Sequence, residues 1–232
     1  MKDDVALYIL SGLFAIFFLV LRCFYLDLYD DYFAREDGVV EYLTALWFLM
    51  ASVFAFMLAR TLGKSKRMEF SRALSYIVSV LFLVAFFEEI SWGQRLIGIE
   101  TPELIEQINT HKETNLHNLK PVQRMLDHLY LLAGIYGMFS GLIYDLLLKK
   151  IGIDRVKDSK WYQLDLLIVP SRYAIFFVPV FVDSVVWFYR YEYEWASWIR
   201  QPDEEYSEFF FAWGWFLSIR HRFKVHKNRF LK

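Results

Sequence analysis

Three polar clusters interrupt a chain that is otherwise rich in apolar residues. They are "EDGVVE" (36–41), "EEISWGQR" (88–95) and "ETNLHN" (113–118). Carboxylates and imidazoles in one site can exchange protons with a substrate, or can hold zinc, manganese or iron. The second cluster directly follows the apolar run "YIVSVLFLVAFF" (76–87). An ionisable residue at membrane depth is a functional candidate by default.

Two acids and one histidine are the predicted catalytic residues. Glu88 and Glu89 are adjacent, so a helix turns their side chains about 100° apart and gives them different neighbours. Glu88 would share a helix face with Trp92 and Arg95, and we expect it to pair with Arg95. Glu89 would face elsewhere and is the predicted reactive or metal-binding acid. His117 is predicted to act beside them, as an acid or as a metal ligand.

Further candidates would bind a divalent metal or a substrate. The predicted metal ligands are Glu41, Glu89, His111, Glu113 and His117. The loop spacing HxExxxH is not a recognised ligand spacing, so without a helix beneath them the two histidines need not meet. The predicted substrate-binding residues are Arg95, Trp92, Gln94, Asn115 and Asn118. Arg95 would bind a phosphate group.

Composition places the chain among membrane proteins. Of 232 residues 56% are hydrophobic and 20% aromatic, which excludes a disordered chain. The net charge of -1 gives no general attraction to nucleic acid, so we expect no nucleic-acid partner. The sequence contains no GxSxG, Walker A, GxGxxG, HExxH or CxxC motif, so it lacks the signatures of several familiar enzyme classes.

We expect an all-α fold, a single polytopic transmembrane helix bundle over residues 1–232 with about six spans. About 20 mostly apolar residues cross the hydrocarbon core of a bilayer. The predicted spans are residues 5–22, 39–59, 72–93, 125–148, 164–189 and 206–219. The fifth holds Pro170, Pro179 and Asp183, so we expect it to be kinked or packed inside the bundle. The sixth is short and either crosses the membrane or lies in its interface.

The distribution of basic residues sets the predicted topology. Three segments hold 5, 5 and 6 Lys and Arg, namely 60–72, 149–160 and 220–232. The other three hold only 2, 4 and 2, namely 22–38, 88–124 and 190–208. By the positive-inside rule, both termini are then cytoplasmic and the three polar clusters meet at the outer leaflet. An external loop (94–123) should carry a short helix at "TPELIEQI" (101–108).

In combination, the three clusters resemble a family of polytopic bacterial inner-membrane proteins of uncharacterised function. The resemblance rests on "EDGVVEYLTAL", "EEISWGQR" and "ETNLHN", and it covers residues 35–120. It implies a bacterial inner (plasma) membrane location and a common site for the three clusters. It implies no particular reaction.

Three hypotheses about function remain open. The first is a membrane-embedded enzyme, a hydrolase or transferase with or without a divalent metal, acting on a lipid or lipid-linked substrate at the outer leaflet. The second is an ion or proton pathway in which the acids form a relay with Asp183. The third is a non-enzymatic membrane protein that binds a protein partner or a second copy of itself. The density of acids beside histidines and amides favours the enzyme.

Overall fold

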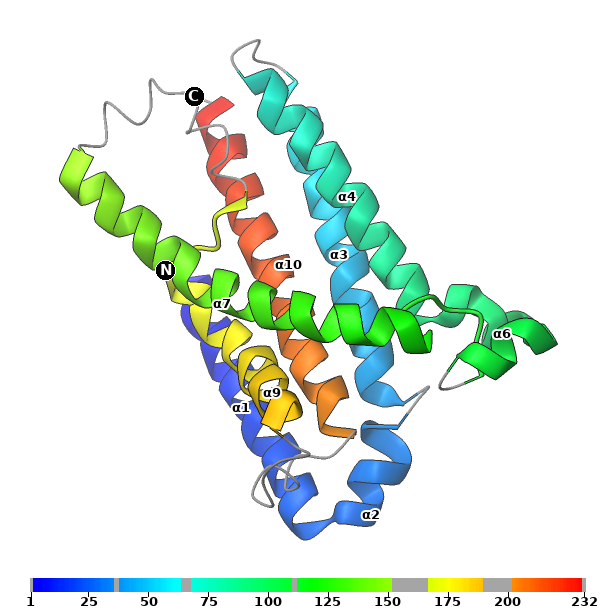
Figure 1. The fold of residues 1–232 in the computed structure, drawn as a ribbon. Coiled ribbons are helices and arrows are strands. Elements are labelled where there is room, and N and C mark those ends of the chain that lie inside the picture. The colour runs from blue at the N-terminus through cyan, green and yellow to red at the C-terminus, as the bar shows by residue number, and fades with distance from the viewer. Residues whose placement is uncertain are drawn as a thin grey trace.

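The computed structural model describes residues 2–35, 38–63, 68–109, 112–151, 167–189 and 202–230. In this part of the chain every regular element is a helix (Figure 1), apart from an isolated β-bridge between Asn109 and Leu119. Three helices are long and apolar enough to cross a membrane: α3 (Val39–Leu62), α4 (Glu69–Glu89) and α7 (Lys120–Ile151) over Lys120–Leu148. The predicted all-α class is confirmed, and these helices suit a membrane protein.

The other predicted spans also fall on helices. The first lies within α1 (Lys2–Phe24). The described part of the fifth span contains η5 (Ser171–Phe177) and α9 (Val178–Tyr189). The helix changes from 3-10 to α geometry beside Pro179, where the sequence predicts a break. The sixth segment is part of α10 (Pro202–Phe230), a helix of 29 residues that is much longer than the sequence predicts.

Small residues hold α3 and α4 together as an antiparallel hairpin. The Ser52 hydroxyl donates a hydrogen bond to the Ser79 carbonyl at 2.8 Å, and the Ser79 hydroxyl donates to the Ser52 carbonyl at 2.9 Å. Ser71 and Ser75 continue the buried stripe on α4 at intervals of four residues. Small side chains allow two helices to approach closely, and paired hydroxyls need no water inside an apolar bundle.

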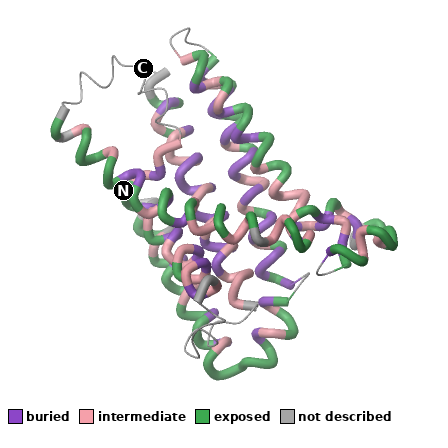
Figure 2. Tube along the Cα trace, viewed as in Figure 1, coloured by how far each residue is buried: buried purple, intermediate pink, exposed green. Residues whose placement is uncertain are grey.

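Helix α10 lies at the centre of the bundle, in contact with α3, η5 and α9 (Figure 1). Its middle turns are almost completely buried (Figure 2), with six residues at 1% exposure or less: Phe209, Ala212, Trp213, Leu217, Ser218 and Ile219. The Trp213 ring stacks on Trp47 of α3, with 5.2 Å between the ring centroids. The middle of the predicted sixth span is thus packed inside the bundle.

Two glycines let α7 approach the segment before α9. A Cβ at Gly137 would lie 2.1 Å from the ring of Phe177, and one at Gly141 would lie 2.1 Å from the carbonyl oxygen of Val169. No other residue fits at either position. The first turns of α7 lie near the end of α4, and α7 then runs obliquely across the bundle away from it (Figure 1).

Candidate functional site

The backbone reverses where α4 ends. The helix ends at Glu89, and the next turn, η3 (Ser91–Gly93), has left-handed backbone angles, with φ of 46° at Ser91 and 56° at Trp92. Such angles cost about 1 kcal/mol or more at each residue with a side chain, so other contacts must hold the turn. The third predicted span, 72–93, therefore ends four residues early, and its predicted helical face does not continue.

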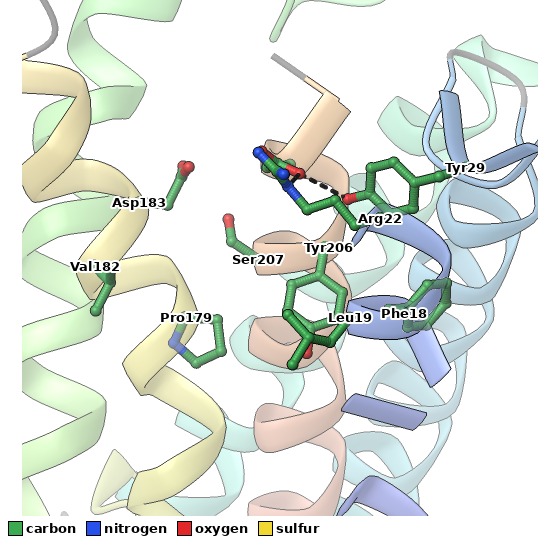
Figure 3. A pocket seen from close by; sticks show the side chains of 10 residues that line it. Phe18, Leu19, Arg22, Tyr29, Pro179, Val182, Asp183, Tyr206 and Ser207 are labelled. Atoms are coloured by element: carbon green, nitrogen blue, oxygen red, sulfur yellow. Dashed lines mark hydrogen bonds and ion pairs between the residues drawn. The ribbon is translucent and has the colours of Figure 1, made fainter. Parts of the chain in front are cut away.

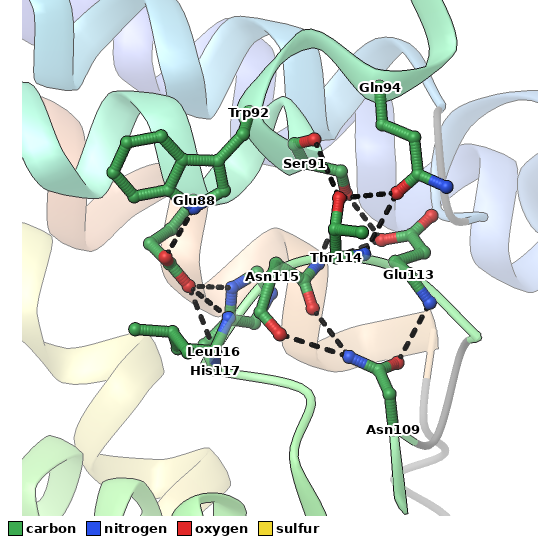
Figure 4. A network of polar contacts seen from close by, with 10 residues as sticks. All are labelled: Glu88, Ser91, Trp92, Gln94, Asn109, Glu113, Thr114, Asn115, Leu116 and His117. Atoms are coloured by element: carbon green, nitrogen blue, oxygen red, sulfur yellow. Dashed lines mark hydrogen bonds and ion pairs between the residues drawn. The ribbon is translucent and has the colours of Figure 1, made fainter. Parts of the chain in front are cut away.

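Glu88 accepts hydrogen bonds from both the turn and the following loop. Its Oε1 accepts from Trp92 Nε1 at 2.7 Å, and its Oε2 accepts from the backbone N–H groups of Leu116 at 2.6 Å and His117 at 3.0 Å (Figure 4). The Trp92 ring also stacks on Phe87, with 5.4 Å between centroids. Glu88 thus fastens the loop to α4 and helps to hold the strained turn.

The imidazole of His117 lies against the same carboxylate. Its Nδ1 is 3.5 Å from Glu88 Oε2. A carboxylate at Nδ1 favours the tautomer with its proton on that nitrogen, which leaves Nε2 able to accept a proton. The backbone of Arg95, the predicted partner of Glu88, lies within α5 (Gln94–Ile97), but its side chain lies outside what the structure describes.

A second set of polar side chains holds the loop together from inside (Figure 4). Glu113 accepts from Ser91 Oγ at 2.6 Å and from Asn115 Nδ2 at 2.8 Å. Asn109 donates to Asn115 Oδ1 at 2.9 Å and accepts from the Glu113 N–H at 3.1 Å. All four side chains belong to residues that are 3% exposed or less. Glu113, predicted as a metal ligand, and Asn115, predicted to bind substrate, therefore support the loop itself.

Gln94 joins the same loop to α5. Its Oε1 accepts from the Thr114 N–H at 2.8 Å and the Thr114 hydroxyl at 2.6 Å, and its Nε2 donates to Thr101 Oγ1 at 2.5 Å. Thr101 in turn donates to the Lys112 carbonyl at 2.6 Å. It does not cap α6 (Glu103–Ile108), the short helix that the sequence predicts in this loop. Gln94 is therefore engaged within the loop rather than presented to a substrate.

A cavity of about 430 Å³ lies between α4, α7 and α10. A stripe of α4 forms one wall: Val78, Leu81, Phe82, Ala85, Glu88 and Glu89. The other walls come from α3, α7, α10 and two loops: Phe48, His117, Leu126, Tyr130, Leu167, Phe211, Trp215 and Ile219. The three predicted catalytic residues therefore line one cavity, at the end of α4.

Among the described residues, the metal ligands expected from the sequence are not brought together. Glu41 is buried in the first turn of α3, at 5% exposure, but it does not line this cavity. Within the described ranges, no three His, Cys, Asp or Glu side chains are grouped so that they could hold a metal ion. His111 lies outside the described residues. The described part of the predicted ligand set, Glu41, Glu89, Glu113 and His117, does not form a metal centre.

The sequence motifs missed two aromatic residues of the cavity. Tyr130 lines it from α7 and Trp215 from α10. Each stands in an apolar stretch, where the sequence alone does not distinguish an aromatic residue that faces lipid from one that lines a site. The signal for Trp215 was the spacing Phe211, Trp215, Ile219, which places all three on one helix face. Asn118, predicted to bind substrate, is 6% exposed, and its Nδ2 finds no acceptor among the described residues.

A smaller cavity of about 180 Å³ lies between α1, α9 and α10 (Figure 3). Arg22 donates to both carboxylate oxygens of Asp203, from Nε at 2.8 Å and from Nη2 at 2.9 Å. Tyr29 donates to the same carboxylate at 3.0 Å. Burial and the nearby Asp203 raise the pKa of Tyr29 well above its usual range, so this hydroxyl remains a donor. Asp183 and Ser207 also line the cavity.

Comparisons with known proteins give no match for this chain to a protein-family model, to a curated protein or to a solved structure. The geometry of the site therefore carries the functional argument. Its central feature is a histidine, positioned by a glutamate, at the polar end of an apolar cavity.

Proposed function

We propose that this protein is a membrane-embedded enzyme that acts on a lipid or lipid-linked substrate, with His117 as its general base. The observation that carries the proposal is the place of His117, which is held by Glu88 and lines a cavity whose walls are otherwise mainly apolar. Pockets of this kind bind the apolar part of a ligand along their walls and orient it through a few polar groups. A hydrocarbon chain suits the walls, and the reacting bond would lie beside His117.

The reaction is a hydrolysis or a group transfer. His117 Nε2 takes a proton from water or from a substrate hydroxyl, and the oxygen attacks the bond that breaks. The imidazolium then gives that proton to the leaving group. Glu88 keeps the ring oriented and stabilises its positive charge. Glu89, which lines the same cavity, would hold the polar group of the substrate.

The proposal includes six membrane crossings with both termini in the cytoplasm. Ring contacts support it: α3 runs parallel to α10, α7 crosses α10 obliquely in the same sense, α1 and η5 run antiparallel to α10, and α4 runs antiparallel to α3. Consecutive segments thus alternate in direction, as six crossings require. The bacterial inner membrane as location rests on the sequence resemblance alone.

Reporter fusions test this topology. A reporter after Lys232 should be cytoplasmic, and one inserted near Asn115 should be external, because the basic residues concentrate on the other side. Two reporters on the same side would contradict the six crossings. They would also remove the outer leaflet as the place of the reaction.

An activity assay tests the proposed chemistry. The protein in lipid nanodiscs would be given synthetic lipids with ester, amide or phosphoester bonds, and products would be identified by mass spectrometry. His117→Gln should lower the rate about 10²- to 10⁴-fold, the usual contribution of a general base. The matched control is His128→Gln, on an exposed position of α7, which should keep the wild-type rate. Equal rates in wild type and His117→Gln would refute the proposal.

A further inference from the structure

A short segment before η5 is held in place by two helices. The Tyr136 hydroxyl of α7 donates a hydrogen bond to the Leu167 carbonyl at 2.8 Å. The Arg222 guanidinium of α10 donates to the next carbonyl, that of Ile168, at 3.1 Å. The backbone is therefore fixed from two sides before η5 begins.

The first two residues of η5 are held as well. Ser171 Oγ donates to the Asp145 carboxylate of α7 at 2.9 Å, and the Tyr8 hydroxyl of α1 donates to the carbonyl oxygen of Arg172. These contacts use the Ser171 side chain and the Arg172 backbone, so they do not engage the Arg172 guanidinium. Arg172 is exposed. The fold thus presents an arginine side chain from a backbone that α1, α7 and α10 hold in place.

Two rings place the guanidinium of Arg172. Its Cζ lies 4.8 Å from the centroid of the Tyr173 ring, and its Nη2 contacts Nδ1 of His221 on α10. A guanidinium can only donate hydrogen bonds, so Nδ1 accepts and the neutral imidazole carries its proton on Nε2. A planar guanidinium that is already held in this way gives up less freedom when it binds two oxygens of a phosphate. The arrangement therefore suits an anion.

The charge around Arg172 also favours an anion. Residues 209–232 contain no Asp or Glu, and the end of α10 that carries His221 holds five Lys and Arg: Arg220, Arg222, Lys224, Lys227 and Arg229. A basic cluster of this size beside a membrane span attracts anionic lipid head groups. The exposed Asp145 would act against an anion, which makes it a useful position for a control variant.

An apolar side chain lies next to Arg172 in the direction of α9. Side chains at i and i+3 of a 3-10 helix lie one above the other, so Ile175 follows Arg172 along the same side of η5. Ile175 is 62% exposed. A phosphate at Arg172 would therefore have an apolar surface within one helical turn. This surface suits the acyl chain of a phospholipid and offers nothing to a free phosphate.

We propose that Arg172, together with the basic end of α10, binds the phosphate of an anionic phospholipid whose acyl chain lies along Ile175. The site is separate from the cavity of His117, so the inference holds whether or not the protein is an enzyme. With the topology proposed above, this lipid lies in the inner leaflet. A free phosphate ester shares the head-group chemistry, and the test below separates it from the lipid.

Native mass spectrometry of the detergent-solubilised protein measures the binding. The probes are dioleoyl phosphatidylglycerol, which is anionic, dioleoyl phosphatidylcholine, which has the same chains and no net charge, and glycerol phosphate, which has no chain. We expect phosphatidylglycerol to bind about tenfold more tightly than phosphatidylcholine. Glycerol phosphate at millimolar concentration should not displace it.

Substitutions at Arg172 test the site itself. Arg172→Gln should weaken the binding of phosphatidylglycerol about tenfold, because it removes charge-assisted hydrogen bonds to the phosphate. The backbone contacts described above do not use this side chain, so the variant should fold, and thermal unfolding checks that it does. Arg172→Lys keeps the charge without the planar fork, so its affinity should lie between those of Arg172→Gln and the wild type.

Two further variants are the controls. Arg60→Gln removes the same charge at an exposed position of α3, which runs parallel to α10, and it should bind phosphatidylglycerol like the wild type. Asp145→Asn should not weaken the binding. Equal losses in Arg172→Gln and Arg60→Gln would mean a general attraction and would overturn the site.

The lipid probes give the other contradicting outcomes. Equal affinity for the two phospholipids would overturn the preference for an anionic head group, and displacement by glycerol phosphate would overturn a lipid as the ligand. His117→Gln should bind phosphatidylglycerol like the wild type. Absence of lipid turnover would therefore refute the proposed enzyme and leave this site, whereas loss of the site would leave the enzyme.

Discussion

Two carboxylates, Asp203 at the start of α10 and Glu88 at the end of α4, are used in different ways. Asp203 accepts hydrogen bonds from two nitrogens of the Arg22 guanidinium and from the Tyr29 hydroxyl, so its charge is matched inside the protein. Glu88 is held by backbone and indole N–H groups and by a histidine, which can change its protonation state. An acid paired with arginine fastens two helices, whereas an acid paired with histidine can position a base.

The two carboxylates also differ in the elements that they join and in the cavities that they line. The Arg22–Asp203 pair joins the end of α1 to the start of α10 and lines the smaller cavity of about 180 Å³. The Glu88–His117 pair joins the end of α4 to a loop and lines the cavity of about 430 Å³. We therefore assign structure to the first pair and chemistry to the second.

The largest effect on stability should come from breaking the arginine pair. Arg22→Met leaves Asp203 and Tyr29 without their cation and should lower the free energy of unfolding by about 3 kcal/mol. Adding Asp203→Leu should restore part of that loss, because both charges are then removed. Unfolding in detergent would measure both variants. Loss of lipid turnover in a folded Arg22→Met protein would show that this cavity belongs to the active site.

Replacing Glu88 or Glu89 by glutamine should change stability less than Arg22→Met does. The two variants should also show which glutamate supports the fold and which acts in turnover. Glu88→Gln should lower the free energy of unfolding by about 2 kcal/mol, since it weakens charged hydrogen bonds to the loop. Glu89→Gln keeps the size of this buried side chain and should reduce turnover, because it removes a charge that lines the cavity. Thermal unfolding and turnover of both variants check this. A stable, fully active Glu89→Gln protein would remove Glu89 from the site.

The buried loop network should tolerate a single loss more readily. Asn109→Ala removes hydrogen bonds to Asn115 and Glu113, and should destabilise the loop by about 1 to 2 kcal/mol. Hydrogen exchange of the amides in 112–118 should rise, while exchange in α3 stays the same. Gln107→Ala, at an exposed position of α6, is the control and should leave exchange unchanged. Unchanged exchange in Asn109→Ala would show that the network does not hold the loop.

The smallest expected effect is a pH dependence from His226. Burial, and then the charge of Arg222, lower the pKa of His226 below its usual 6.5. The unfolded chain therefore binds a proton at a higher pH than the folded protein does. Stability should fall as the pH drops below about 6.5, with a slope of at most about 1.4 kcal/mol per pH unit. His226→Gln should flatten this part of the profile, and an unchanged profile would assign the dependence to other groups.

The sequence predicted those parts of the fold that depend on local composition. Apolar runs located α3, α4 and α7, because each is long enough to cross a bilayer by itself. The same reasoning brought Glu88, Glu89 and His117 to one site, where they line one cavity. The central place of α10 was not evident, because charged residues at both ends and tryptophans in its middle make it resemble an interfacial segment.

Other parts depend on contacts that no local pattern records. The reversal after α4 uses positive φ at Ser91 and Trp92, which residues with side chains seldom adopt, so a continued helix was the natural prediction. Arg22 and Asp203 are 181 residues apart, and neither stands in a motif. The contact between Glu88 and His117 was not predicted either, because it depends on how the loop folds back through hydrogen bonds around Asn109, Gln94 and Glu88 itself.

The most direct test of the central claim is a double-mutant cycle on lipid turnover with Glu88→Gln and His117→Gln. If Glu88 acts by positioning His117, the double variant should be no slower than His117→Gln alone, because the glutamate has nothing left to position. Turnover should be compared per mole of folded protein, so that the loss of stability in Glu88→Gln does not enter. If the rate losses of the two single variants instead multiply in the double variant, Glu88 and His117 act independently. The claim that Glu88 positions His117 as a base would then be refuted.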